Sequence, residues 1–228
     1  MSWGFGEGCT ASLIHDPADV IAEAFDQADD RDPGRLRPWL VLVDGARHQL
    51  DLIETEARHR NVKIHILIDF IHVAEYVWTA AHAFHPVGSI AAETFATETL
   101  TAILHGHADR VAHEMTTRAG KVQLTGTKRN SVDTCVRYLT GHLDQLRYDI
   151  ALKKGWPIAT GSVEGACRHL IGDRLDITGA RWGLAGAEAV LKLRAVHANG
   201  DLYAYLAYHH TREHQRTYPD QHHYQLGA

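Results

Sequence analysis

The sequence has few cysteines, no basic leader and no long apolar segment. Its three cysteines, Cys9, Cys135 and Cys167, are widely spaced and form no Cys-x-x-Cys pair. This spacing disfavours a disulfide framework or a cysteine-rich zinc site and is typical of a reducing compartment. The N-terminus lacks the basic and then apolar order of a signal peptide. The longest uncharged run, 76–92, contains two histidines, a proline and a glycine, which disfavours a membrane span. We therefore expect a soluble, cytoplasmic protein with no membrane association.

An excess of positive charge is also lacking. The chain holds 28 acidic and 23 basic residues, a net charge of −5, which by itself argues against a nucleic-acid-binding surface. The charges are unevenly distributed, since residues 1–60 hold 12 acidic and 6 basic residues whereas residues 147–194 hold 5 acidic and 8 basic residues. Charge alone favours a mixed, solvated surface, although a basic stretch in an acidic chain can still meet phosphates.

Two short apolar runs, 39–43 and 62–68, predict two strands. A helix is predicted before them over 17–30, and another lies between them over 49–60, where apolar residues recur at helical spacing: Leu50, Ile53 and Ala57. A strand, a helix and a strand in close succession form a βαβ unit, so the two strands should be parallel neighbours.

The remainder of the chain is predicted to be mainly helical. Strand signals are weak after residue 70, and helical spacing of apolar residues recurs in four stretches: 72–83, 90–118, 128–150 and 184–198. The expected fold class is α/β, more narrowly α+β with a large helical content. We divide the chain into four parts: residues 1–69 with both strands, a helical block over 70–155, a further structured part over 156–208, and a flexible tail over 209–228.

Asp44 and Asp69 each follow one of the predicted strands. Ligands of open α/β sheets bind at the carboxyl ends of the strands, so both residues are candidates for chemistry. The alternative for Asp44 is turn formation with Gly45. Asp69 either joins His72, three residues later, in a metal or hydrogen-bonded site, or caps the helix that follows. Two adjacent strands that both end in Asp favour the functional interpretation.

A third carboxylate, Glu164, lies in a glycine-rich segment at a predicted helix start. The flanking Gly161 and Gly165 weaken a helix, which indicates a close backbone approach there. An ordinary alternative is a favourable helix-dipole position with an ion pair to Arg168. Basic residues follow Glu164 and either flank a phosphate track or pair with nearby aspartates: Arg168, Arg174 and Arg181.

Taken in order, these motifs resemble bacterial insertion-sequence transposases of the ISKra type, which are relatives of the Mutator-like DDE group. They read Val-Leu-Val-Asp44-Gly, Leu-Ile-Asp69-Phe-Ile-His72 and Pro157-Ile-Ala-Thr-Gly-Ser-Val-Glu164-Gly-Ala-Cys-Arg-His-Leu. The resemblance covers about 13–218, and 157–199 is its most specific part.

The resemblance implies a partial ribonuclease-H-like core, made of the βαβ unit plus a catalytic helix, with an all-helical insertion. It implies Asp44 as the second catalytic acid and Glu164 as the third, both as metal ligands for two Mg²⁺ or Mn²⁺ ions. It gives Asp69 and His72 a supporting role and assigns DNA binding to the basic residues Arg168, Arg174 and Arg181. The implied partners are the DNA of the transposon ends and target, and further copies of the chain in a homo-oligomer.

The sequence departs from this pattern at the first catalytic acid. No strand that ends in Asp is predicted before Trp39, so we expect a truncated transposase that is inactive alone. Two alternatives stay open. One is a non-catalytic remnant that binds DNA or oligomerises. The other is an unrelated metallohydrolase that uses Asp44, Asp69 and His72.

Overall fold

The computed structural model describes residues 12–159 and 183–217. The described residues fall into two compact units, one over 34–159 and one made of 12–33 with 183–217. The described part is an α+β fold, in which helices accompany one two-stranded parallel sheet. None of its helices combines the length and the apolar character needed to span a membrane.

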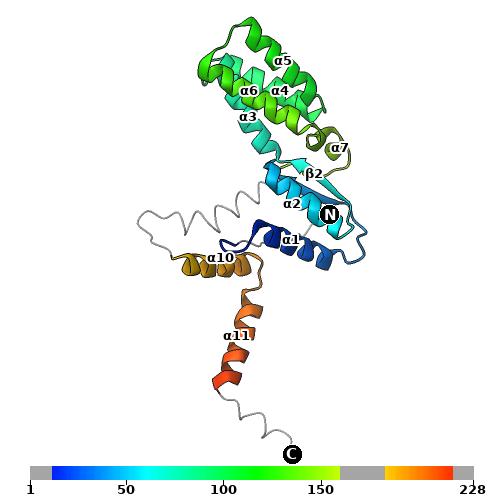
Figure 1. Cartoon of the computed structure of the whole chain (residues 1–228), viewed down its shortest axis with the longest axis vertical. Coiled ribbons are helices and arrows are strands. Elements are labelled where there is room, and N and C mark those ends of the chain that lie inside the picture. The colour runs from blue at the N-terminus through cyan, green and yellow to red at the C-terminus, as the bar shows by residue number, and fades with distance from the viewer. Residues whose placement is uncertain (1–11, 160–182, 218–228) are drawn as a thin grey trace, which may run out of the picture. The chain divides into compact units, whose positions relative to one another are not determined.

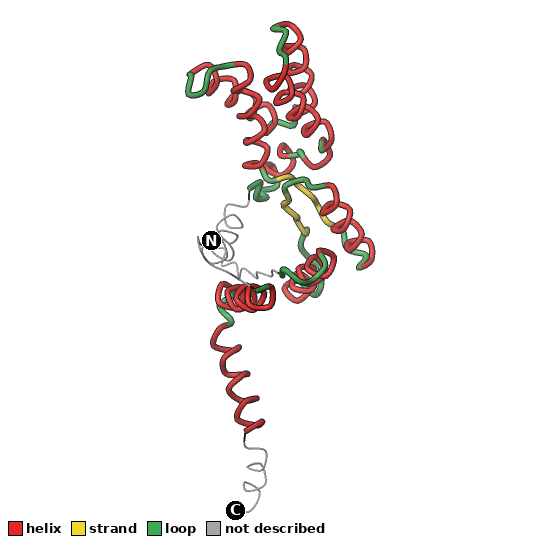
Figure 2. The backbone as a smooth tube through the Cα atoms, turned by 60° about the vertical axis from the view of Figure 1, so that its left-hand side comes forward, coloured by secondary structure: helices red, strands yellow, loops and turns green. Residues whose placement is uncertain are grey.

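The sheet of the first unit pairs β1 (Trp39–Val43) with β2 (Ile64–Ile68) in parallel, and the register runs from Trp39 opposite Ile64 to Val43 opposite Ile68. The strands are yellow in Figure 2. Between them runs α2 (Arg47–His59), which buries the predicted face of Leu50, Ile53 and Ala57. The predicted βαβ unit is therefore confirmed.

The second strand begins two residues later than the sequence predicted, at Ile64 instead of Val62. Asn61 takes a left-handed φ of 52°, and the backbone N–H of Val62 donates to the carbonyl of Ala57 over 2.9 Å. This is a helix-terminating arrangement that satisfies a carbonyl of the last turn of α2. Val62 thus belongs to the turn that follows α2, and the strand starts after it.

A block of helices follows β2 directly, as predicted. Figure 1 shows it in cyan to green, with α3 and α6 side by side. In it, α3 packs against α4 and α6, and α5 packs against α6. Small residues such as Ala80, Ala96 and Ala119 are fully buried, which lets the helices approach closely. The helices are α3 (Phe70–Phe84), α4 (Ile90–Leu104), α5 (Ala108–Lys121), α6 (Gly126–Gly141), the 3₁₀ turn η1 (Leu143–Gln145) and α7 (Tyr148–Lys153).

The stretch predicted as one helix over 90–118 is two helices, because the chain turns at Gly106. This glycine has a φ of 84°, and a Cβ there would lie 3.0 Å from the side chain of Asp149. Both the conformation and the close contact require glycine. The turn reverses the chain between α4 and α5, and periodicity alone does not reveal it.

The second unit contains α1 (Pro17–Arg31), α10 (Leu184–Ala198) and α11 (Leu202–Thr217). The buried carboxylate of Glu188 on α10 accepts hydrogen bonds from the Ser12 hydroxyl over 2.8 Å and from the Leu13 backbone N–H over 2.6 Å. The segment before α1 is thereby fastened to α10. The helices predicted over 17–30 and 184–198 are present, while α11 continues past residue 209 with no buried residue.

Candidate functional site

The candidate site lies at the carboxyl edge of the sheet. Because Val43 pairs with Ile68, the residues that follow them, Asp44 and Asp69, leave the sheet at the same edge. The backbone N–H of Asp69 donates to the carbonyl of Val43 over 2.7 Å, which continues the ladder to this point. The structure therefore brings together the two aspartates that the sequence proposed.

Asp44 combines a turn role with an available carboxylate oxygen. Its Oδ1 accepts from the backbone N–H of Ala46 over 2.8 Å, as an Asp-Gly turn requires. The residue is exposed, and its Oδ2 has no hydrogen-bond partner among the described residues. One oxygen thus orients the carboxylate and leaves the other open to a ligand.

Asp69 caps the helix that follows it. Its Oδ1 accepts from the backbone N–H of Ile71 over 2.8 Å at the start of α3. This is the capping role that the sequence left as the alternative. His72 does not pair with it, since its Nδ1 lies 3.1 Å from Oε2 of Glu75, one turn later on α3. Glu75 is a residue that the sequence analysis missed, although its spacing of three from His72 could have indicated it.

Tyr138 of α6 connects the helical block to the carboxyl edge of the sheet. Its hydroxyl donates to the carbonyl of Asp44 over 2.6 Å, and its ring stacks on Tyr76 at 4.0 Å. Burial raises the pKa of Tyr138 above its ordinary value, and the negative charges of Asp44, Asp69 and Glu75 raise it further. Because its pKa is raised, Tyr138 stays a neutral hydrogen-bond donor. Three carboxylates lie near enough to this edge to act on it.

Two more side chains of the block hold strand-end carbonyls. His142 contacts the carbonyl of Gly45 through Nε2 at 3.0 Å and that of Tyr138 through Nδ1 at 2.8 Å. Both partners are carbonyl oxygens that only accept, so each contact needs an N–H on the ring nitrogen that faces it. The buried Tyr148 donates to the carbonyl of Ile68 over 2.8 Å, and burial raises its pKa. Sequence reasoning missed all three side chains, because the strand-end carbonyls that they contact lie 80 to 97 residues away in the chain.

The chain returns to the same edge after the helical block. The backbone N–H of Phe70, next to Asp69, donates to the carbonyl of Ile158 over 2.9 Å. The segment that leads toward Glu164 thus passes this edge. Four predicted site residues lie outside the described residues: Glu164, Arg168, Arg174 and Arg181.

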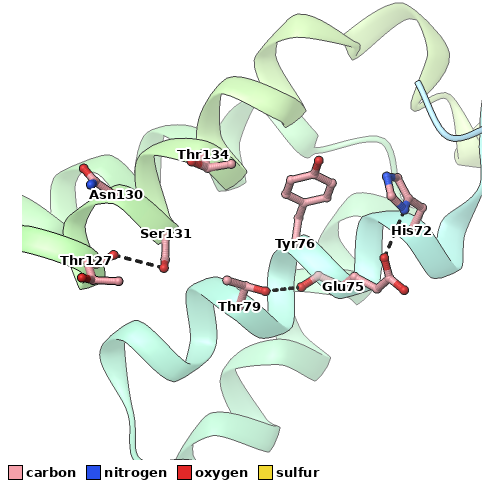
Figure 3. Close-up of a pocket in the computed structure, with 8 residues that line it drawn as sticks. All are labelled: His72, Glu75, Tyr76, Thr79, Thr127, Asn130, Ser131 and Thr134. Atoms are coloured by element: carbon pink, nitrogen blue, oxygen red, sulfur yellow. Dashed lines mark hydrogen bonds and ion pairs between the residues drawn. The ribbon is translucent and has the colours of Figure 1, made fainter. Parts of the chain in front are cut away.

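A groove of about 420 Å³ opens beside the site, between α3 and α6. Figure 3 shows side chains of both helices along its walls, with Tyr76 between His72 and Thr134. The lining residues are His72, Glu75, Tyr76 and Thr79 from α3, and Thr127, Asn130, Ser131 and Thr134 from α6. The stacked Tyr76 and Tyr138 connect this groove with Asp44.

Comparisons of this chain with models of protein families, with curated proteins and with solved structures found no match. Within 12–159 and 183–217, no group of three or more His, Cys, Asp and Glu side chains gathers closely enough to hold a metal ion.

Proposed function

We propose that this chain is the C-terminal part of a DDE-type DNA transposase, a divalent-metal-dependent enzyme that cleaves DNA and transfers strands. In this proposal, Asp44 and Glu164 are two of three catalytic acids. The observation that carries it is the position of Asp44, which follows a paired parallel strand and exposes its carboxylate at the edge where α/β sheets bind ligands.

The order of elements along the chain also supports the proposal. The resemblance implies helices between the second and third acids, and the helices from α3 to α7 lie between β2 and Ile158. Ile158 is bonded to Phe70 at the sheet edge, and Glu164 follows six residues later in the sequence. The ribonuclease-H-like core is part of the same proposal, of which the described sheet contributes two strands.

The donor chemistry of Asp44 fits a divalent metal. Carboxylate oxygens are hard ligands that suit Mg²⁺ and Mn²⁺, and Asp44 offers one such oxygen without a partner in the described residues. When bound, two such ions would supply activation of a water or 3′-hydroxyl nucleophile and stabilisation of the leaving oxygen. Glu164 and Asp44 would both bind these ions.

The other residues of the edge position Asp44. Tyr138 and His142 hold the carbonyls of Asp44 and Gly45, so the turn cannot rotate without breaking two hydrogen bonds. The Ala46 N–H then fixes the direction of the Asp44 carboxylate within that turn. Asp69 supports the arrangement by starting α3, which carries Tyr76 beneath Tyr138.

The alternative of a metallohydrolase built on Asp44, Asp69 and His72 has less support. One oxygen of Asp69 caps α3, and His72 is directed to Glu75. The two functions differ in a simple test. Metal binding that requires His72 but not Glu164 would favour the hydrolase.

Metal affinity tests the assignment directly. Mn²⁺ binding is measured by calorimetry for the natural chain, Asp44→Asn and Glu164→Gln, with Asp51→Asn as a control. Asp51 is an exposed carboxylate on α2 that pairs with Arg47 at 3.5 Å. We expect both site variants to lose at least about tenfold in affinity and the control to lose none. Equal affinity for all four chains would refute the proposal.

Strand cleavage gives the second readout. Because only two of the three acids are assigned in this chain, we expect little cleavage of transposon-end DNA by this chain alone. Robust cleavage that disappears in Glu164→Gln would overturn that expectation, and it would mean that the site is complete.

A further inference from the structure

The helix α11 combines full exposure with a group of histidines. None of its residues is buried, and every residue from Tyr203 to Thr217 is exposed. The second half of the helix contains His209, His210 and His214. Figure 1 shows α11 as one continuous helix. Its imidazoles are therefore carried on a regular backbone, and in the described part of the chain they contribute to no hydrophobic core.

Two of these histidines have the spacing of a chelating pair. His210 and His214 are four residues apart, so their side chains lie one turn apart on the same face of the helix. The Cβ atoms of such a pair are about 5–6 Å apart. Imidazole nitrogens bind zinc at about 2.0–2.1 Å, so both rings can reach one ion between them. Paired histidines at this spacing on a helix are a known zinc-binding arrangement.

We propose that His210 and His214, the histidine pair, chelate a divalent ion of the class that imidazole prefers: Zn²⁺, Ni²⁺ or Cu²⁺. The inference goes beyond the proposed function, because Asp44 lies in the first compact unit and α11 in the second. The metals differ as well, since Mg²⁺ and Mn²⁺ prefer the oxygen ligands that Asp44 offers.

The third histidine of the helix provides a contrast. His209 is next to His210 in the sequence and therefore points to a different side of α11. Its ring lies 4.3 Å from the ring of Tyr205 and 5.5 Å from that of Tyr208. His209 thus has aromatic neighbours on its own helix and lies outside the histidine pair.

The two arginines of α11 do not oppose a cation at the pair. Arg212 is two residues from each histidine and so lies on another face, where it donates to the Tyr208 hydroxyl over 3.0 Å. Arg216 pairs with Glu213 at 2.7 Å. Both positive charges are therefore held by other side chains of the helix.

The pair supplies two protein ligands. Within 12–159 and 183–217, no third His, Cys, Asp or Glu side chain joins two others closely enough to complete a set. The remaining positions of the ion are then left to water, as in zinc sites that keep open positions. Such an ion is held by the chelate of the two rings, and both rings are needed.

Calorimetric titration of the whole chain with Zn²⁺ tests the pair. The variants are His210→Ala, His214→Ala and the two together. The matched control is His209→Ala, which removes an imidazole from another side of the same helix. Circular dichroism checks that each exposed substitution leaves the helix content unchanged. A Mn²⁺ titration of every chain, with Asp44→Asn added, covers the proposed function separately.

We expect each single substitution to lower the Zn²⁺ affinity at least about tenfold. Because a chelate requires both rings, the double substitution should lower the affinity little further than either single one. His209→Ala should leave it unchanged. Binding to the natural chain should weaken between about pH 7.5 and about pH 5, since a protonated imidazole cannot bind a metal.

Three results would overturn the inference. The first is an equal loss in His209→Ala and His210→Ala, which means an adventitious ion shared among surface histidines. The second is a double variant whose loss is the sum of the two single losses, which means independent rings. The third is an unchanged Zn²⁺ affinity in the double variant. Unchanged Mn²⁺ binding in Asp44→Asn would count against the proposed function alone, because Zn²⁺ binding by the histidine pair does not involve Asp44.

Discussion

Replacement of Gly45 by alanine tests whether the turn at Asp44 is as tightly held as the structure indicates. Gly45 has a φ of 92°, which costs an L-residue roughly 1–2 kcal/mol. A Cβ there would also lie 2.8 Å from Cδ1 of Ile68, 3.2 Å from the Tyr138 hydroxyl and 3.3 Å from Nε2 of His142. Since Ile68 is fully buried, the added methyl group overpacks the edge at a cost of about 1–3 kcal/mol.

The free energy of unfolding should therefore fall by about 2–5 kcal/mol in Gly45→Ala. Gly88→Ala is the matched control, because Gly88 has a φ of 72° but no atom within 4 Å of the place that a Cβ would take. It should lose only about 1–2 kcal/mol. Urea unfolding measures both. Equal losses would show that no close contact surrounds Gly45, and they would refute the account of how Asp44 is positioned.

Three further predictions concern the same unit. Tyr148→Phe should lower the free energy of unfolding by about 1–3 kcal/mol in urea, because it strips the Ile68 carbonyl of a buried donor; a loss below about 0.5 kcal/mol contradicts this. Asp69→Ala should lower the free energy of unfolding by about 1 kcal/mol through the lost helix cap, whereas Asp69→Asn should keep most of the stabilisation by the cap. Equal losses in the two variants would exclude capping. The Arg147 hydrogen bond lowers the pKa of Asp149, so its stabilisation should be complete above the ordinary Asp pKa and disappear as the pH falls through the lowered value. Unfolding from pH 6 to 2 should depend more steeply on pH in the natural chain than in Asp149→Asn, whose remaining slope comes from other carboxylates such as Glu188.

The local elements were predictable because their signals are local. Apolar runs bounded by Asp indicated β1 and β2, and the spacing of Leu50, Ile53 and Ala57 indicated the buried face of α2. The position of Asp44 at a strand end follows from the same pattern. Helix boundaries were less predictable, since the turn at Gly106 depends on contact with Asp149 from a distant helix.

The partners of the site residues were not predictable in the same way. The sequence could not decide between a cap and a ligand for Asp69, and both options involve the same residue at the same spacing. The structure shows the cap and directs His72 to Glu75. Glu164 and the basic residues after it lie outside the described residues and stay predictions.

Local patterns in the chain were sufficient to predict the βαβ unit, the helical block after it and the positions of Asp44 and Asp69 at strand ends. These features depend on periodicity and strand length, which act over a few residues. Folding in three dimensions was needed to show that Tyr138, His142 and Tyr148 hold the carbonyls at that edge. Those contacts join residues that are 80 to 97 positions apart. A hydrogen bond of that kind depends on how α6 and α7 pack against the sheet, and no spacing within either segment encodes it.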